Sequence, residues 1–221
     1  MKILEKQGYH ILILAFLLLG ANFLLSRADL TGSFLGISSR GWFWLSILIP
    51  IIHQVYVVIF WRAELYHQLM TKWFGNRGFV FWAVGFFILF LARPVVITCL
   101  AIANQGSLLI PVWLGLSLGI LCIPPVIYLG YSVGKYFGIE RALGMDHFQP
   151  REFRDKPFVK QGIFRWTPNP MYTFGFLMFW IPGLVLFSRV AILSALFSHI
   201  YVWVHFYFTE YPDMKYIYKL E

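Results

Sequence analysis

The chain has 221 residues, of which 59% are apolar, 20% aromatic and only 13% charged, and its mean hydropathy is +0.69. Soluble domains average roughly 45–50% apolar and about 25% charged residues, so the composition excludes a mainly soluble protein and indicates an integral membrane protein. The net charge of +8 does not indicate nucleic-acid binding. Lys and Arg cluster in loops beside apolar runs, which is typical of cytoplasmic loops and contact with anionic headgroups.

Neither cysteine indicates a disulfide bond or a metal site. Cys99 and Cys122 both fall in apolar runs, so we expect no disulfide framework and no metal site. The first apolar run ends in "FLLSRADL" without a small-x-small cleavage site, so we expect no cleaved signal peptide. The final "YKLE" predicts no prenylation.

Apolar runs recur along the chain, and a membrane-spanning helix needs about 20 mostly apolar residues. Candidate spans lie near 9–26, 42–61, 78–102 and 107–132. The apolar stretch 171–208 is too long for one span and is broken by "FSRV", so it predicts a helical hairpin. The prediction is an all-α, polytopic membrane protein with about six transmembrane helices in a single domain, 1–221. Four helices fall within 1–132, and the catalytic region is expected in 133–221.

The loops alternate in charge. Basic residues concentrate at the N-terminus, in 62–77, in 133–170 and in the tail. The intervening loops are poorer: 103–106 has no charge, 188–189 has one Arg, and 27–41 has two Arg beside one Asp. The positive-inside rule therefore places both termini and segment 133–170 in the cytoplasm. This segment, the longest polar one, is expected to fold back on the membrane and form a cytoplasmic cofactor pocket.

Three glycines recur at every fourth position where the fourth span meets the polar segment: Gly130, Gly134 and Gly138. Small residues at such spacing allow close packing of membrane helices. Backbone without Cβ atoms equally leaves room for a cofactor. Both interpretations remain open at the level of sequence.

The last apolar run carries three polar residues of interest. His199 and Glu210 are eleven residues apart, about three turns of α-helix, so we expect them on one face and His205 on another. An intramembrane carboxylate is either paired near the surface or functional, and Glu210 is the strongest single candidate. His53, in the second span, and His67, after it, are expected to contact lipid headgroups.

Three short stretches then point to a family. They are "GKYFGIE" (134–140), "GIFRWTPNPMY" (162–172) and "TEYPDMKYIY" (209–218). Their order and spacing resemble integral-membrane methyltransferases of the phospholipid N-methyltransferase and isoprenylcysteine carboxyl methyltransferase group. Pro168 and Asn169 stand where the isoprenylcysteine type has Arg-His, which favours the phospholipid branch. The family's paired glutamates are reduced to Glu210 followed by Tyr211.

The resemblance implies S-adenosylmethionine as cofactor and a lipophilic acceptor, expected to be a phospholipid amine headgroup, that enters from the bilayer. Glu210 would accept from the cofactor's ammonium or ribose, Arg165 would bind its carboxylate, and Tyr172 would face its sulfonium. An amine acceptor must lose a proton, which requires a base. The expected catalytic residues are Glu210, Asn169, His147 and Asp146. The expected cofactor-binding residues are Gly115, Gly134, Gly162, Arg165, Thr167, Pro168, Asn169, Pro170, Tyr172, Glu210 and Tyr211.

Several of these residues have a purely structural alternative. Arg165 is equally explained as a positive-inside anchor and Tyr172 as an interfacial aromatic. For Asp146 and His147 the structural alternative, that they are solvated loop residues, is the favoured one.

Other functions remain open. One is methylation of a prenylated cysteine carboxylate or of another hydrophobic small acceptor. An NADPH-dependent sterol-type reductase would need further basic and His-rich motifs after Glu210, and a transporter or scaffold would need charges across several spans. The acceptor, the oligomeric state and the host membrane are not determined by the sequence.

Overall fold

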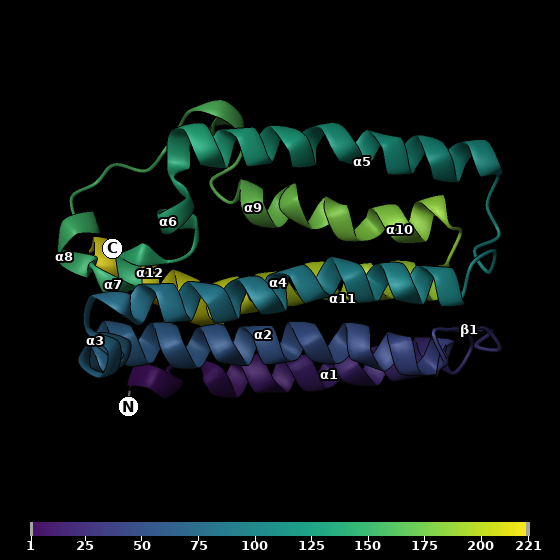
Figure 1. The fold of residues 1–221 in the computed structure, drawn as a ribbon, viewed down its shortest axis with the longest axis horizontal. Coiled ribbons are helices and arrows are strands. Elements are labelled where there is room, and N and C mark those ends of the chain that lie inside the picture. The colour runs from purple at the N-terminus through teal and green to yellow at the C-terminus, as the bar shows by residue number, and fades with distance from the viewer. Residues whose placement is uncertain (1, 220–221) are drawn as a thin grey trace.

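The computed structural model describes residues 2–219 and confirms an all-helical architecture, with helices running side by side in a bundle (Figure 1). The chain end on which the prenylation expectation rests, residues 220–221, lies outside the described residues. Five helices are long and apolar enough to cross a membrane. They are α1 (Gln7–Leu25), α2 (Ser39–His67), α4 (Gly78–Ala103), α5 (Val112–Ser132) and α11 (Arg189–His205) with its continuation through η6 (Phe206–Glu210) and α12 (Tyr211–Tyr218).

The expected C-terminal hairpin has arms of unequal length. Its first arm is a shorter apolar segment, 170–185, built from α9 (Pro170–Thr173), η5 (Gly175–Phe179) and α10 (Trp180–Val185). The second arm is α11, which begins after the N-cap Ser188, whose hydroxyl accepts from the Ala191 amide. The protein is therefore a multi-pass membrane protein with five long apolar helices and one short arm, where the sequence predicted about six spans.

Short elements connect the long helices. A two-stranded antiparallel ribbon, which the sequence analysis did not predict, pairs Ser33 with Ser38 and turns at Gly36, whose φ of +76° suits glycine. The connecting elements are η1 (Lys2–Leu4), β1 (Ser33–Phe34), β2 (Ile37–Ser38), α3 (Leu69–Phe74), η2 (Gly75–Arg77), the π-helical turn η3 (Val133–Phe137), α6 (Ile139–Ala142), α7 (Met145–Phe148), α8 (Pro150–Phe153) and η4 (Gly162–Arg165).

The basic segments gather at one end of the bundle. Figure 1 shows the N-terminus, α3, α6 to α8 and α12 at its left end, and β1 at the other. The prediction that both termini and the 133–170 segment share one side therefore agrees with the arrangement of the helices. Which membrane face this end occupies stays a prediction.

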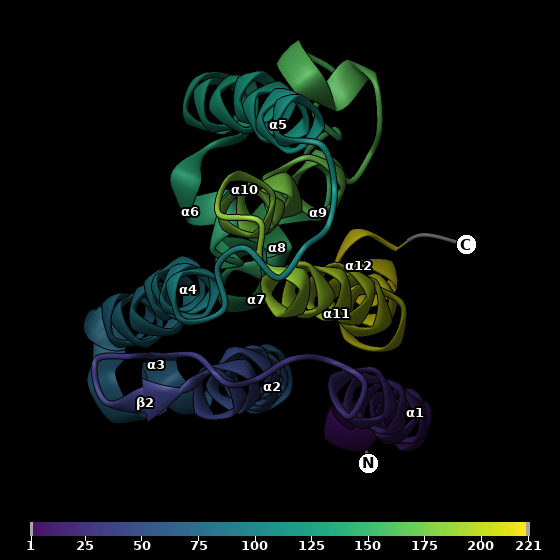
Figure 2. The same ribbon diagram turned by 90° about the vertical axis from the view of Figure 1, so that its right-hand side faces the viewer.

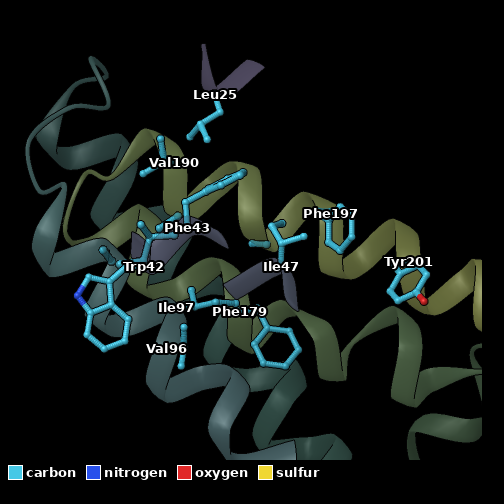
Figure 3. Packing of buried hydrophobic residues seen from close by; sticks show 14 of the residues in the cluster. Leu25, Trp42, Phe43, Ile47, Val96, Ile97, Phe179, Val190, Phe197 and Tyr201 are labelled. Atoms are coloured by element: carbon cyan, nitrogen blue, oxygen red, sulfur yellow. The ribbon is translucent and has the colours of Figure 1, made fainter. Parts of the chain in front are cut away.

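Burial separates central from peripheral helices. In the apolar part of the last helix 61% of residues are buried, against 11% in α1 and 17% in α5. In the end-on view, α10 lies between α5 on one side and α4 and α11 on the other (Figure 2). The main core joins α2, α4, η5 and α11, through side chains such as Phe43, Ile97, Phe179 and Val190 (Figure 3). The short arm is thus held inside the bundle.

Candidate functional site

A cavity of about 460 Å³ runs from the loop end of the bundle towards its core. Its walls come from α2, α4, the end of α5, the turn 138–147, the arm 168–179 and the last helix. Small-molecule sites typically measure about 300–1,000 Å³, so the volume suits a ligand.

The first wall is the "TPNPMY" turn. Pro168 and Pro170 keep the residues before them out of helical geometry. Asn169 is consequently non-helical (φ −121°, ψ 57°), and its carbonyl oxygen accepts from the amides of Tyr172 at 3.2 Å and Thr173 at 3.1 Å. The side-chain amide of Asn169 lines the cavity and has no hydrogen-bond partner among residues 2–219. The two prolines thus leave the Asn169 side-chain amide free at the cavity. They also start the short helix α9, from which Tyr172 points into the cavity.

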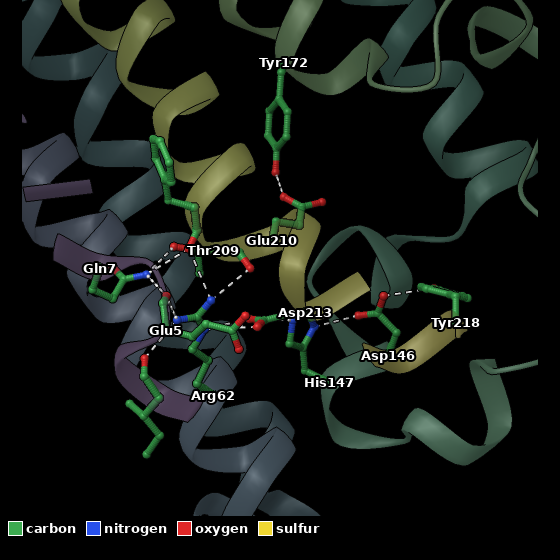
Figure 4. Close-up of polar contacts among 12 residues, drawn as sticks. Glu5, Gln7, Arg62, Asp146, His147, Tyr172, Thr209, Glu210, Asp213 and Tyr218 are labelled. Atoms are coloured by element: carbon green, nitrogen blue, oxygen red, sulfur yellow. Dashed lines mark hydrogen bonds and ion pairs between the residues drawn. The ribbon is translucent and has the colours of Figure 1, made fainter. Parts of the chain in front are cut away.

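The opposite wall is the end of the hairpin's second arm. The Tyr172 hydroxyl donates a hydrogen bond to Glu210 Oε2 across the cavity (Figure 4). This contact joins the two motifs that carry the family resemblance, although 38 residues separate them in the chain.

A π-helical turn orients this wall. Residues Phe206–Glu210 hydrogen-bond over five residues, as the Tyr211 amide does to the Phe206 carbonyl. Five residues of π-helix return to nearly the same face, so His205 and Glu210 both line the cavity. The expectation that His205 lies on another face is therefore wrong, because it assumed α-helical periodicity. His199 accepts from Trp180 Nε1 at 3.1 Å and is not part of the cavity wall.

One backbone carbonyl just before Glu210 takes its hydrogen-bond donors from other parts of the chain. Pro212 has no N–H, so the Phe208 carbonyl lacks the donor that a regular α-helix would supply. Gln7 Nε2 at 3.0 Å and Arg62 Nη2 at 3.3 Å donate to this oxygen instead. Figure 4 shows both side chains converging on the turn. The N-terminal segment and α2 therefore hold the backbone that carries Glu210.

Arg62 also begins a buried polar network beside the cavity. It is fully buried and donates from Nε to both Asp213 carboxylate oxygens at 3.0 and 3.1 Å. His147 Nε2 lies 3.7 Å from Asp213 Oδ2, an ion-pair distance rather than a hydrogen bond. Its Nδ1 lies 2.9 Å from Asp146 Oδ1, and the Tyr218 hydroxyl donates to Asp146 Oδ2 at 2.9 Å.

The electrostatics of this network favour a charged His147. Burial alone would lower its pKa, but Asp146 and Asp213 outweigh burial and raise the pKa to about 9. Burial alone would raise the pKa of Asp146, but the His147 charge and hydrogen bonds from His147 and Tyr218 hold it below its usual value. A protonated His147 between two carboxylates is a poor proton acceptor. It is therefore suited to fix Asp146 in place rather than to act as a base.

The turn that carries His147 depends on one glycine. Gly144 has φ +84°, and a Cβ there would overlap the Trp61 indole. His147 stacks on the same indole, with ring centroids 4.2 Å apart. Asp146 and His147 are 8% and 2% exposed, so the alternative of solvated loop residues is wrong.

The structure brings part of the predicted site together. Seven of the predicted residues line the cavity: Gly134, Asp146, His147, Pro168, Asn169, Tyr172 and Glu210. At Gly130 and Gly134 an added Cβ would meet nothing within 4 Å, so neither serves close helix packing. Both glycines instead leave space along the cavity wall.

Other predicted residues lie elsewhere. Arg165 is exposed beside Trp166, and Tyr211 is 37% exposed; neither lines the cavity. Gly162 packs on Ser132 and Tyr136 at the end of α5, with φ +58°. Gly115 packs against Leu184 and Phe187 of the short arm and its turn. The remaining two, Thr167 and Pro170, shape the proline turn without lining the cavity.

Four basic residues that line the cavity were not assigned to the site by the sequence analysis: His53, Arg93, Arg141 and His205. His53 is 3% exposed, so the expectation that it contacts headgroups is wrong. The available signal was the position of Arg93 and His53 inside apolar spans, since ionisable groups there are functional candidates by default.

The comparison with known families decides the class. The model of the phospholipid methyltransferase family matches residues 114–221, which include the proline turn, Glu210 and the Asp146–His147 pair. Residues 114–221 belong to the phospholipid methyltransferase family. Members are methyltransferases that use S-adenosylmethionine, so the protein is an enzyme of this kind. No curated protein and no solved structure matches the chain.

The cavity of the methyltransferase fits this cofactor chemically. Glu210 provides a carboxylate for an ammonium or ribose hydroxyl, and the free Asn169 amide can pair with an adenine edge. Arg141, which contacts the Tyr218 hydroxyl at 3.3 Å, supplies a cation at the loop end of the cavity. The open space at Gly130 and Gly134 admits a bulky group.

Proposed function

We propose that this methyltransferase transfers a methyl group to the amine headgroup of a phospholipid at the cytoplasmic face of the membrane. The observation that carries the proposal is how the composition of the cavity changes along its length. Its loop end holds Asp146, Glu210 and Tyr172, whereas its inner end is lined mostly by apolar side chains such as Phe90 and Phe179, with Arg93, His53 and Gln54 among them. A polar compartment suits a cofactor arriving from water, and an apolar one suits a lipid arriving from the bilayer.

The cofactor would be held at the loop end. Arg141 takes the place that the sequence analysis gave to Arg165, because Arg141 lines the cavity and Arg165 does not. Its guanidinium can bind a carboxylate through paired N–H groups. Tyr172 presents an aromatic ring next to the Glu210 carboxylate, and together they favour a cationic centre in the cavity beside them.

Methyl transfer requires a deprotonated amine. When bound, S-adenosylmethionine would supply an electrophilic methyl group. The amine nitrogen, after losing a proton, would form the new N–C bond with its lone pair as the S–C bond breaks and S-adenosylhomocysteine leaves. Glu210 is the proposed base, since it lines the cavity and the structure gives it only Tyr172 as a hydrogen-bond partner among residues 2–219. Tyr172 holds the carboxylate in place, and the apolar lining excludes water.

Two experiments test the proposal in the purified protein. Thermal unfolding in detergent is compared with S-adenosylmethionine, S-adenosylhomocysteine and NADPH, because a ligand that binds only the folded state raises the midpoint. We expect both sulfur compounds to raise it and NADPH to have no effect. Labelled S-adenosylmethionine is then supplied with a total lipid extract, and the product is expected to be an N-methylated phospholipid. A base-labile methyl ester would instead indicate a carboxylate acceptor and contradict the proposal.

A further inference from the structure

Arg93 is a buried cation that no carboxylate among residues 2–219 neutralises. It lies in α4 inside the apolar span, is 3% exposed and lines the cavity. Its Nε and Nη2 atoms have no hydrogen-bond partner, and no carboxylate forms an ion pair with it among residues 2–219. Its guanidinium lies 4.9 Å from the Phe176 ring centre and 4.7 Å from that of Phe179. Two aromatic faces orient the group but leave its donors free.

The surroundings of Arg93 resemble an incomplete anion site. His53 is 3% exposed and lines the cavity, and neither of its ring nitrogens is hydrogen-bonded within the described part of the chain. Gln54 lines the same wall and is 5% exposed. Burying a charge without a partner costs several kcal/mol, so such groups are normally paired or bind a ligand. Unpaired hydrogen-bond donors that face one cavity indicate that their partner is an anionic ligand.

The cofactor is not the source of that charge. In the proposed function its carboxylate binds Arg141 at the loop end, which contacts Tyr218 beside Asp146. Arg93 is fifteen residues beyond the start of α4 at Gly78, or about 22 Å along the helix. A sulfonium placed beside Arg93 would also be repelled.

The order of groups along the cavity matches a lipid headgroup. Arg93 contacts Phe176, and Phe176 contacts Tyr172, with ring centres 6.3 Å apart, so Arg93 lies just inside Tyr172 and Glu210. A phospholipid amine with its tails in the bilayer presents the phosphate further inside than the amine. The phosphate would then reach Arg93 while the amine points to Glu210.

We propose that Arg93, with His53 and Gln54, forms an oxyanion subsite that binds the phosphate of the acceptor lipid. The inference rests on the proposed phospholipid acceptor, but the subsite lies in the part of the chain before residue 114, outside the family match. Arg93 is thus a specificity-determining residue: it selects acceptors that carry an oxyanion next to the amine.

The first test measures binding without turnover. Dodecyl phosphate, laurate and inorganic phosphate are titrated against wild type, Arg93→Gln, Arg93→Lys and Arg189→Gln in a neutral detergent, by thermal unfolding. Arg189 is an exposed arginine at the other end of the bundle and serves as the matched control. We expect dodecyl phosphate to stabilise wild type and Arg189→Gln, and to bind Arg93→Gln at least about tenfold more weakly, because charge-assisted hydrogen bonds are lost. Arg93→Lys should recover part of the affinity.

Comparison of the three ligands identifies the anion. Stabilisation by dodecyl phosphate, but not by inorganic phosphate, supports a lipid-borne group. Equal stabilisation by inorganic phosphate would assign the subsite to a free ion, and a preference for laurate would assign it to a lipophilic carboxylate; either result overturns the proposal. Equal binding of dodecyl phosphate by wild type and Arg93→Gln also overturns it.

The second test separates this role from cofactor binding and from folding. Without ligand, Arg93→Gln should unfold at the same or a higher temperature than wild type, because it removes an unpaired buried charge. Its affinity for S-adenosylhomocysteine should be unchanged. A loss of cofactor affinity would overturn the inference by assigning Arg93 to the cofactor carboxylate, and a lower midpoint would assign it a structural role.

The third test compares turnover of two acceptor substrates by wild type and Arg93→Gln, since the variant leaves the proposed cofactor site unaltered. Phosphatidylethanolamine carries the phosphate, and hexadecylamine carries an amine and a tail without it. We expect Arg93→Gln to raise the KM for the phospholipid at least about tenfold and to leave that for hexadecylamine unchanged. Equal effects on both acceptors overturn the subsite. Absence of transfer to any amine by wild type would instead refute the proposed function, while the binding titrations still decide the subsite.

Discussion

At the scale of single residues, the Glu210 carboxylate carries the proposed chemistry. Its hydrogen bond from Tyr172 links the two ends of the hairpin across the cavity. Neither residue could be paired from sequence spacing alone, because 38 positions separate them. The pairing depends on the proline turn, which starts a helix aimed at the cavity, and on the π-turn, which fixes the face of Glu210.

Substituting these residues should reduce turnover to different degrees. Glu210→Gln removes the base and should lower methyl transfer by about 10²–10⁴-fold. Tyr172→Phe removes one hydrogen bond to the carboxylate and should lower transfer roughly tenfold. Tyr207→Phe, at a 55% exposed neighbouring position, is the matched control and should have no effect. Transfer of labelled methyl groups measures all three, and full activity of Glu210→Gln would refute its role as base.

His147 should make stability depend on pH. Its pKa is raised from an ordinary 6.5 to about 9 in the folded protein by the two neighbouring carboxylates. A raised pKa means that the stabilisation is complete below pH 6.5 and is lost as the pH rises through about 9. The unfolding midpoint of wild type should therefore fall across this window more steeply than that of His147→Gln. Parallel curves for the two proteins would show that His147 is not charged in the folded state.

At the scale of elements, α5 and its π-helical continuation use glycines in two ways. Gly119 lies against the short arm, where an added Cβ would be 2.8 Å from Val185 Cγ2, whereas Gly134 borders open space in the cavity. The sequence pattern is the same small residue on an apolar helix. Only the packing of α10 against one end of α5 separates the structural glycine from the one that borders the site.

Leucine at the two positions should therefore give opposite results. Gly119→Leu should overpack the interface, at a cost of about 1–3 kcal/mol, and lower the unfolding midpoint without changing the affinity for S-adenosylhomocysteine. Gly134→Leu should leave the midpoint nearly unchanged and weaken binding of the same ligand. Calorimetric titration and thermal unfolding measure both variants. Normal binding by Gly134→Leu would show that the cofactor does not use this wall.

The helices themselves were predictable to a large extent. Long apolar runs and basic loops predicted the spans, because length and loop charge follow directly from the bilayer. The ribbon at Ser33–Ser38 and the π-turn at Phe206–Glu210 were missed. The π-turn depends on donors from Gln7 and Arg62, which are distant in sequence, so local periodicity could not reveal it.

At the scale of the whole molecule, the bundle separates a polar loop end from an opposite end with few charges. The division into a helical region, 1–132, and a catalytic region, 133–221, stays a prediction, and the cavity takes residues from both. Arg93 shows the limit of sequence reasoning here. Its charge was visible in the sequence. That no carboxylate among residues 2–219 pairs with it can be seen only from the packing of α2, α4 and the short arm.

The orientation of the bundle can be tested by labelling single cysteines. Asp155→Cys lies in the polar loop segment, and Leu109→Cys, at a 93% exposed position, lies at the opposite end, each in a background lacking Cys99 and Cys122. A membrane-impermeant maleimide added to intact cells should label only the variant at position 109. Lysis should make position 155 reactive. Labelling of position 155 in intact cells would invert the proposed orientation.

The position of the cofactor is the central claim, and ultraviolet photolabelling tests it most directly. The purified protein is irradiated with radiolabelled S-adenosylmethionine, with excess S-adenosylhomocysteine as competitor, and the labelled peptides are mapped. The account predicts competed labelling within the proline turn around Tyr172 and the last helix around Glu210. Competed labelling confined to residues 39–103, with neither of these segments modified, would contradict it.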